Sequence, residues 1–181
     1  MDLYDLIIRR HSVRKYTEQQ ITEEQLKKII DAGLSAPSGG NTQPWHFSVI
    51  QNQEVQSKLV RYCKQAFLQS NVEWRKKWAT MDNFNPFYAP NVIIVVSNKN
   101  VVEKSNEDCC FAIQNMALMA ESLGLGSCII RDICWAIDKT NQAEFGIPQD
   151  YDCFMCLSVG YPELKNNNIK ALDFSKVNYL K

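Results

Sequence analysis

This chain of 181 residues has no net charge, no long apolar run and few histidines. The 20 basic residues balance the 20 acidic residues, and there are two histidines. This balance excludes a global positive field for nucleic acid or for a membrane surface, so any anion site must be local. No apolar run reaches the roughly 18 residues of a membrane span, so we expect no transmembrane segment.

The chain also lacks the motifs of several enzyme and metal-binding classes. It contains no Walker motif and no G-x-G-x-x-G fingerprint, and no Ser-His-Asp or Cys-His arrangement is evident. His11 and His46 are too few and too scattered to support a zinc site. We therefore expect neither a metal centre nor a catalytic side-chain nucleophile.

The seven cysteines do not follow the spacing of a disulfide-stabilised domain. Most of them lie in apolar segments, which is typical of buried free thiols in a reducing compartment. The first residues, MDLYDLIIRR, are acidic where a signal peptide would be basic, so we expect a cytoplasmic protein. Cys153 and Cys156 form a C-x-x-C pair, but residues three apart in a strand point to opposite faces. This spacing favours two core thiols over a redox or metal site.

The hydrophobic periodicity predicts one α+β domain, a mixed α/β arrangement over residues 1–181. The predicted helices cover residues 2–9, 22–37, 53–69, 105–123 and 138–145, and Thr22 with Gln25 is expected to form a capping box at the start of the second. The predicted strands begin at residues 45, 90, 126 and 151. PNVIIVVSN is almost continuously apolar, which favours a central strand of the sheet.

The predicted helix at 105–123 is unusual because CCFAIQNMALMAESLG is apolar almost all round. Such a helix must be buried on nearly every side. We favour an interface between two subunits as the cover. The alternative is a helix held between a sheet and other helices of the same chain.

RRHSVRKY, residues 9–16, concentrates positive charge in a chain of zero net charge. In an extended segment Arg10, Ser12 and Arg14 share one face, because successive side chains alternate. Two guanidiniums with a hydroxyl between them make a good phosphate clamp. The alternative is a solvated surface face, which is the usual position of a charge run.

Two other stretches are candidates for ligand contact. APSGGNTQPW, residues 36–45, is a loop of small and polar residues that lets a planar ligand approach the backbone; it could also be a plain connection. LGLGSCII, residues 123–130, ends a helix and leads directly into a strand. That order is the reverse of a dinucleotide-binding turn.

Aromatic and basic residues alternate between residues 70 and 90, where they could suggest binding of single-stranded nucleic acid. The residues concerned are Trp74, Arg75, Lys76, Lys77, Trp78, Phe84, Phe87 and Tyr88. The neutral net charge argues against that function. We expect instead a mobile lid over a pocket.

Taken together, RRHSVRKY, APSGGNTQPWHF and LGLGSCII resemble the nitroreductase family of FMN-dependent oxidoreductases in order and spacing, over essentially the whole chain. The resemblance is to short-chain members, which are related to the flavin-dependent iodotyrosine deiodinases. It implies a small, mostly antiparallel central sheet flanked by helices. It also implies an intertwined homodimer with an extended C-terminal tail at about 163–181.

The resemblance further implies which residues bind FMN. The phosphate and ribityl chain would be held by Arg10, His11, Ser12 and Arg14. A loop from the partner subunit would contribute Pro37, Ser38, Gly39 and Asn41. The backbone near flavin N5 would be that of Ile129, Ile130 and Arg131, and a basic residue of the tail, Lys170, would reach the phosphate.

The implied activity is hydride transfer from NADH or NADPH, through flavin N5, to a small nitroaromatic or quinone acceptor by a ping-pong mechanism. No side-chain acid or base is obligatory for this chemistry. Ile129, Ile130 and Arg131 depart from the Pro, Trp or Gly of many relatives, and Arg131 could reach an acidic or phosphate-bearing substrate. No Glu-Tyr-Lys trio aligns with a deiodinase lid, so iodotyrosine is not the expected substrate. The alternatives are a specialised flavin reaction such as reductive dehalogenation, or a low-turnover flavin-binding redox module.

Overall fold

The computed structural model describes residues 2–99, 105–164, 169 and 171–180. Its α-helices are α1 (Leu3–Arg9), α2 (Glu23–Leu34), α3 (Gln53–Leu68), α4 (Glu73–Ala79) and α5 (Ser105–Ser122). Its strands are β1 (Trp45–Ile50), β2 (Val92–Lys99), β3 (Gly126–Ile130) and β4 (Tyr151–Gly160). Short 3-10 turns are η1 (Gly39–Asn41), η2 (Asp132–Trp135), η3 (Gln142–Phe145) and η4 (Phe174–Lys176).

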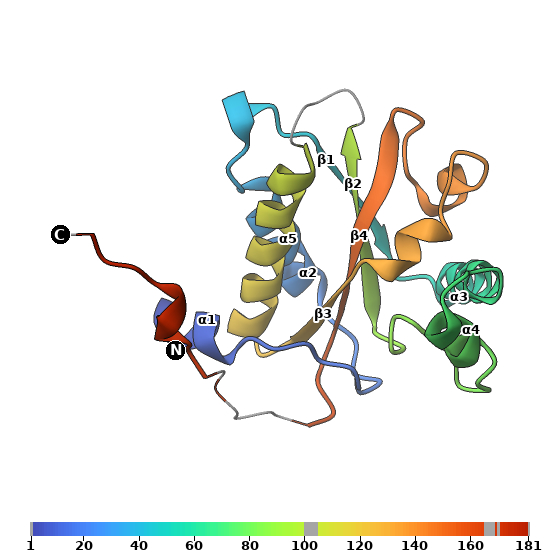
Figure 1. Ribbon diagram of the computed structural model, residues 1–181, viewed down its shortest axis with the longest axis horizontal. Helices are drawn as coiled ribbons and strands as arrows, with labels where there is room; N and C mark the ends of the chain where they lie inside the picture. Colours follow the sequence, from blue (N-terminus) through green and yellow to red (C-terminus); the bar gives the residue numbers. More distant parts are fainter. Residues whose placement is uncertain (1, 100–104, 165–168, 170, 181) are drawn as a thin grey trace.

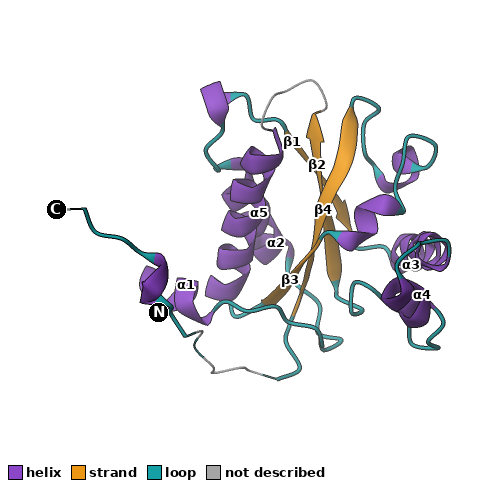
Figure 2. Cartoon of the chain, viewed as in Figure 1, coloured by secondary structure: helices purple, strands orange, loops and turns teal. Residues whose placement is uncertain are grey.

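The four strands form an antiparallel sheet in the order β1-β2-β4-β3. Helices α2 and α5 cover one face, and α3 and α4 lie on the other (Figures 1 and 2). Alternate side chains of β2 enter the two cores: Ile94 and Val96 pack with α2 and α5, while Ile93 and Val95 pack with α3. Because β2 is covered on both faces, its sequence is continuously apolar, and its predicted central position is confirmed.

Most of α5 is buried by its own chain. Cys109, Ile113 and Met116 belong to the core between the sheet and α2. The outer stripe is exposed, and Phe111 on that stripe is half exposed. The single chain therefore accounts for most of the apolar character of α5, and Phe111 is the large apolar side chain that it leaves exposed.

The second helix begins as its sequence predicts. The Thr22 hydroxyl accepts the Gln25 backbone N–H at 3.2 Å, and the Gln25 side chain accepts the Thr22 N–H at 3.0 Å. This reciprocal capping box satisfies two backbone donors that the first turn of a helix leaves free.

The predicted helix at 138–145 is replaced by a tight turn followed by η3. The Asp138 carboxylate accepts both the backbone N–H and the hydroxyl of Thr140. The Asn141 side chain accepts the Asp138 N–H at 2.9 Å. These side chains take the donors that a helix would use, so only the short turn η3 follows before Gly146 ends it with a φ of 73°.

The predicted orientation of Cys153 and Cys156 is wrong. The ladder between β2 and β4 shifts register: Val96 pairs with Met155, and the next residue, Ser97, pairs with Cys153. Phe154 is therefore the extra residue of a β-bulge, which reverses the alternation of side chains. Both thiols lie in or against the core on the α3 side of the sheet.

Candidate functional site

The N-terminal motif joins the outer edge of the sheet at β3. Ser12 forms a parallel bridge with Ser127, and the Val13 N–H donates to the Ser127 carbonyl at 2.9 Å. Figure 1 shows this segment running beside β3 below the C-terminal end of α5. The fold therefore brings together two of the three predicted motifs, RRHSVRKY and LGLGSCII, within one chain.

Two glycines of LGLGSCII explain how the segments approach each other. Gly124 has a φ of 74°, the left-handed conformation that ends a helix. A Cβ placed on Gly126 would lie 2.6 Å from Cγ2 of Val13. Only glycine lets the N-terminal segment pack this closely against the start of β3.

Arg10, Ser12 and Arg14 gather around one thiol at the sheet edge. Burial raises the pKa of Cys128, and the nearby charges of Arg14 and Arg10 and a hydrogen bond from Ser12 partly offset that rise. All three side chains therefore lie close enough to the Cys128 thiol to affect its titration. His11, between them in sequence, turns back to the Arg9 carbonyl, 3.1 Å from its Nδ1.

The two arginines of this cluster have no carboxylate partner within the part of the chain that the structure describes. Arg14 instead lies over the ring of Tyr88, with 5.7 Å between the guanidinium carbon and the ring centroid. The neighbouring cation, Lys15, pairs with Glu163 at 3.9 Å. Two converging guanidiniums without an anion are an arrangement suited to a phosphate group.

The outer edge of β3 continues beyond this cluster. The Ser127 carbonyl points outward and accepts the Val13 N–H. Along an antiparallel strand the N–H and C=O of successive residues point alternately to the two neighbouring sides. The N–H of Ile129 therefore points to the same outer edge, on the side away from β4. The exposed Arg131 follows, with its guanidinium 5.9 Å from the ring centroid of Phe154. This edge offers backbone donors and one cation along a line that starts at the arginine cluster.

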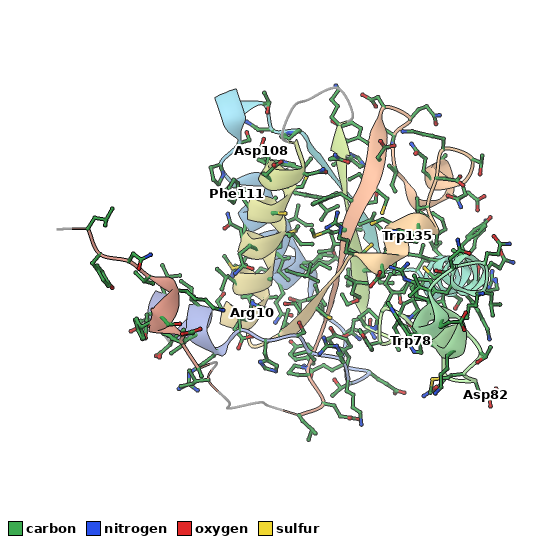
Figure 3. The ribbon with its side chains drawn as sticks, in the orientation of Figure 1. Arg10, Trp78, Asp82, Asp108, Phe111 and Trp135 are labelled. Atoms are coloured by element: carbon green, nitrogen blue, oxygen red, sulfur yellow. The ribbon has the colours of Figure 1, made fainter. Side chains whose placement is uncertain are left out.

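The third predicted motif, residues 36–45, lies elsewhere. The buried Asp108 carboxylate accepts the Gly39 N–H at 3.2 Å, which holds the loop at the first turn of α5. Arg10 and Asp108 are labelled at opposite ends of α5 in Figure 3. An α-helix of 18 residues is about 27 Å long. One chain therefore does not bring Pro37, Ser38, Gly39 and Asn41 to its own arginine cluster.

The loop itself is unusually constrained. The Ser38 hydroxyl accepts the Gln43 N–H at 2.9 Å. Asn41 and Gln43 have left-handed φ values of 55° and 46°, which non-glycine residues rarely adopt. The sequence places Asp108 in the first turn of the helix that begins at Ser105, but its contact with the loop at 36–45 was not predicted.

The segment predicted as a lid is packed in this structure. Phe84 and Phe87 are buried, and Phe67, Trp78 and Phe84 form a cluster with ring centroids less than 6 Å apart. Tyr88 stacks on Trp78 of this cluster and also contacts Arg14. Motion of this segment stays a prediction. The other predicted contact, Lys170, lies outside the described residues.

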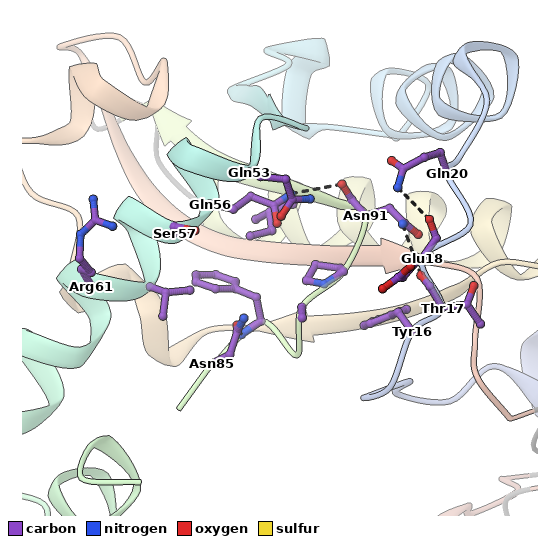
Figure 4. A pocket seen from close by; sticks show the side chains of 15 residues that line it. Tyr16, Thr17, Glu18, Gln20, Gln53, Gln56, Ser57, Arg61, Asn85 and Asn91 are labelled. Atoms are coloured by element: carbon purple, nitrogen blue, oxygen red, sulfur yellow. Dashed lines mark hydrogen bonds between the residues drawn. The ribbon is translucent and has the colours of Figure 1, made fainter. Parts of the chain in front are cut away.

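A cavity of about 870 Å³ lies beside the site rather than in it (Figure 4). Its walls come from residues 16–20, the first half of α3 and the loop at 85–93. Amide side chains such as Gln53, Gln56 and Asn91 line it, and none of Arg10, Ser12, Arg14 and Arg131 does.

Metal sites and membrane-spanning helices are both absent from the described residues. No group of three or more His, Cys, Asp or Glu side chains there could hold a metal ion. No helix in the same part of the chain is long and apolar enough to cross a membrane. The cationic edge of β3 is therefore the candidate site that geometry and charge both favour.

Together, the antiparallel sheet between two helical layers and the cationic edge define an α+β protein that binds a phosphate-bearing ligand. A sequence model described as "Nitroreductase family" matches residues 7–161, so the chain belongs to the nitroreductase family. A protein of Archaeoglobus fulgidus, whose name proposes NADH dehydrogenase or NAD(P)H nitroreductase activity, is 29% identical over 93% of this chain and 90% of its own length.

Two further relatives are similar over most of their length. An iodotyrosine deiodinase of Thermotoga neapolitana is 29% identical and covers 89% of each chain. The crystal structure of a nitroreductase with bound FMN from Bacteroides fragilis matches all of this chain and all of its own, with a TM-score of 0.92 and 28% identity. The resemblance stated from the three motifs is confirmed, as is the mostly antiparallel sheet.

Proposed function

We propose that this chain is an FMN-dependent oxidoreductase that transfers hydride from NADH or NADPH to a small nitroaromatic or quinone acceptor. The observation that carries the proposal is the pair Arg10 and Arg14, two guanidiniums near the Cys128 thiol that have no carboxylate partner in the described residues. The Bacteroides fragilis relative, which has the same fold, contains bound FMN.

The charge at the edge of β3 suits the phosphate of FMN. Arg10, Ser12 and Arg14 would bind the phosphate, and the outward Ile129 N–H would donate to the edge of the flavin ring. The proposed contacts of one chain are His11, Ile130, Arg131 and Lys170 in addition to these residues. When bound, FMN supplies the redox chemistry, accepting hydride from the donor and passing it to the acceptor in two separate half-reactions.

This chain's own contribution is binding and orientation. No side-chain acid or base is required, which agrees with the lack of a triad. Arg131 ends β3 with an exposed guanidinium, in a position to attract an acidic or phosphate-bearing donor or acceptor. Tyr88 lies over Arg14 and would shield the phosphate from water on that side. Residues 70–90 would act as a lid whose aromatic side chains cover the bound acceptor.

A homodimer completes the proposed site. The loop with Pro37, Ser38, Gly39 and Asn41 lies about one helix length from the arginines of its own chain, so a partner's loop would have to supply these contacts. Large apolar side chains are exposed on α1, on the outer stripe of α5 and on the tail: Leu3, Tyr4, Ile7, Phe111, Leu172, Phe174 and Tyr179. Exposed apolar surface of this extent is typical of a subunit interface.

The proposed compartment is the cytoplasm. All seven cysteines are free thiols, four of them buried. Free thiols in a core persist where glutathione and thioredoxin keep them reduced.

The visible spectrum of the purified protein, followed during addition of NADH or NADPH, tests the proposal. Flavin absorbance that bleaches with a reduced nicotinamide and returns with a nitro compound is the expected result. Arg10→Ala and Arg14→Ala should each weaken FMN binding by about tenfold or more, because each charge-assisted bond contributes roughly 1.5–3 kcal/mol. Arg61→Ala, which removes an exposed arginine of the neighbouring cavity, is the matched control. Unchanged FMN affinity in both site variants, or a protein that stays colourless with excess FMN, would refute the assignment.

Reductive dehalogenation is a second candidate, favoured by the Thermotoga neapolitana relative. Halide release from a halogenated phenol, measured beside nitro-compound turnover under the same conditions, separates the two. The proposed function predicts the faster reaction with the nitro compound.

A further inference from the structure

Four of the seven thiols gather on the α3 side of the sheet. Cys63 comes from α3, Cys134 from η2, and Cys153 and Cys156 from β4. The Cys153 thiol donates a hydrogen bond to the Cys134 sulfur, with 3.0 Å between the two Sγ atoms. Cys156 and Cys63 both lie close enough to Cys153 to affect its pKa, and Cys63 also affects that of Cys156.

The bulge in β4 is what brings these thiols together. Without the extra residue Phe154, Cys153 would point to the α5 side of the sheet, away from Cys156. On the other side of the contact, η2 is held in place by the Cys134 N–H, which donates to the Arg131 carbonyl at 3.2 Å. Both sulfurs therefore sit on short, hydrogen-bonded backbone segments.

The four thiols differ in access to solvent. Cys63 and Cys156 are fully buried, whereas Cys134 and Cys153 are partly exposed. A small reagent from solution therefore has better access to the outer pair than to the inner pair. The outer sulfurs need to approach by only about 1 Å to reach the roughly 2.05 Å of a disulfide bond.

We propose that Cys134 and Cys153 are a dithiol site that small-molecule disulfides oxidise reversibly to an internal disulfide. One thiol loses its proton and attacks a sulfur of the small disulfide, forming a mixed disulfide and releasing one small thiolate. The second protein thiol loses its proton and attacks the mixed disulfide. The Cys134–Cys153 bond forms and a second small thiol leaves, so two protein thiols are oxidised and one small disulfide is reduced.

The surroundings make the first step slow at neutral pH. Its hydrogen bond with Cys153, together with burial, raises the pKa of Cys134. Arg131 opposes that rise and Asp132 adds to it, while Cys63 and Cys156 are the titratable neighbours of Cys153 from α3 and β4. Because the thiolate is the nucleophile, oxidation should speed up by about tenfold for each pH unit from 7 to 8.

The disulfide would act next to the proposed flavin site without belonging to it. Cys134 lies three residues after Arg131, so the bond would tie η2 to β4 directly behind the end of β3. The inference does not depend on FMN, because the thiol pair is formed by one chain and is measured without cofactor turnover.

Peptide mass spectrometry of the reduced full-length protein, incubated with glutathione disulfide and then alkylated under denaturing conditions, tests this proposal. Trypsin separates Cys134, in the peptide 132–139, from Cys153 and Cys156, in the peptide 140–165. The expected product is a link between these two peptides, with Cys156 alkylated. A link inside the peptide 140–165 would overturn the proposal. So would alkylation of both Cys134 and Cys153 in a sample in which the exposed Cys110 has reacted with glutathione disulfide.

Three variants provide matched controls. Cys153→Ser should leave Cys134 trapped as a mixed disulfide with glutathione, because the second attack is lost. Cys156→Ser, on the same strand, and Cys110→Ser, on α5, should still form the link. If Cys156→Ser is folded by circular dichroism but no longer forms the link, Cys156 and not Cys153 would be the partner of Cys134. That result would reject the proposed Cys134–Cys153 pair. Regeneration of both free thiols by dithiothreitol, read in the same assay, checks that the step is reversible.

Discussion

Arg14 and Arg75 are two arginines of one chain that the fold treats in opposite ways. Arg75, on α4, is 8% exposed; its Nη2 lies 2.5 Å from Asp132 Oδ1, and its guanidinium stacks 3.9 Å from the Trp135 ring centroid. Arg14 is exposed and has no carboxylate partner among the described residues. The arginine that the fold uses is paired and covered, whereas the one that we propose binds a ligand is left open.

The environment of Arg75 shows what the fold gains from it. Trp74 and Phe67 also lie near its guanidinium, at 5.3 and 5.9 Å from ring centroid to Cζ. These aromatic faces partly replace the hydrogen bonds that its buried Nε and Nη1 do not make in the described structure. Because Asp132 and Trp135 belong to η2, Arg75 joins α4 to the turn that follows β3.

The largest expected effect comes from removing this paired arginine. Arg75→Ala leaves a cavity under Trp135 and strips Asp132 of its partner, so we expect unfolding free energy to fall by about 3 kcal/mol. Arg14→Ala should change it by less than about 0.5 kcal/mol, as is usual for an exposed side chain. Urea denaturation of the two variants without cofactor measures both values. Equal losses in both would mean that the two arginines do not differ in role.

Gly126 and Gly124 allow a similar comparison at the backbone, because only Gly126 packs against the segment that carries the arginines. Gly126→Ala would place a Cβ 2.6 Å from Val13, so the segment that carries Arg10 and Arg14 must shift, at a cost of about 2 kcal/mol. Gly124→Ala meets no atom within 4 Å and costs only the strain of a φ of 74°, about 1 kcal/mol. Thermal unfolding ranks the two.

The effect of the two glycine substitutions on FMN binding is measured separately. Gly126→Ala should also weaken FMN binding, because it displaces the arginines, and Gly124→Ala should leave that affinity nearly unchanged. Fluorescence titration with FMN reads the difference. Wild-type affinity in a clearly destabilised Gly126→Ala would show that the segment does not carry the phosphate site.

Inorganic phosphate tests the open arginines without assuming a flavin. If Arg10 and Arg14 form an anion site, phosphate at about ten times its dissociation constant should stabilise the protein by roughly 1.4 kcal/mol. The effect should shrink in Arg14→Ala and persist in Arg75→Lys. Chloride at equal ionic strength is the control for general screening. Identical shifts in wild type and Arg14→Ala would locate the phosphate somewhere else.

Much of the fold could be read from the sequence because its signals are local. The capping box at Thr22 and the continuous apolar run of β2 predicted their elements correctly. The alternation of Arg10, Ser12 and Arg14 predicts that they share a face, and all three lie near Cys128 in the structure. That part of the candidate site depends only on an extended backbone.

Features that depend on distant pairing could not be predicted in this way. The bulge at Phe154 arises from the register between β2 and β4, so no local pattern shows that Cys153 and Cys156 share a face. Arg75 looked like one charge of a basic run, and its burial depends on Asp132 and Trp135, far along the chain. The burial of Phe84 and Phe87 was hidden for the same reason.

The smallest expected effect compares two serines of neighbouring strands: the Ser158 hydroxyl has a hydrogen-bond partner in the described structure, and the Ser127 hydroxyl has none. Ser158 donates its hydroxyl to the Phe87 carbonyl at 3.0 Å, so Ser158→Ala should cost about 1 kcal/mol. Ser127, beside Ser12 at the site, is 1% exposed and its hydroxyl has no partner within the described residues. Ser127→Ala removes a buried unsatisfied group, so stability without cofactor should stay the same or rise by up to about 1 kcal/mol. Paired urea titrations resolve a difference of this size. A loss in Ser127→Ala as large as that in Ser158→Ala would show that the fold already uses this hydroxyl, and that the site edge is less open than its arginines indicate.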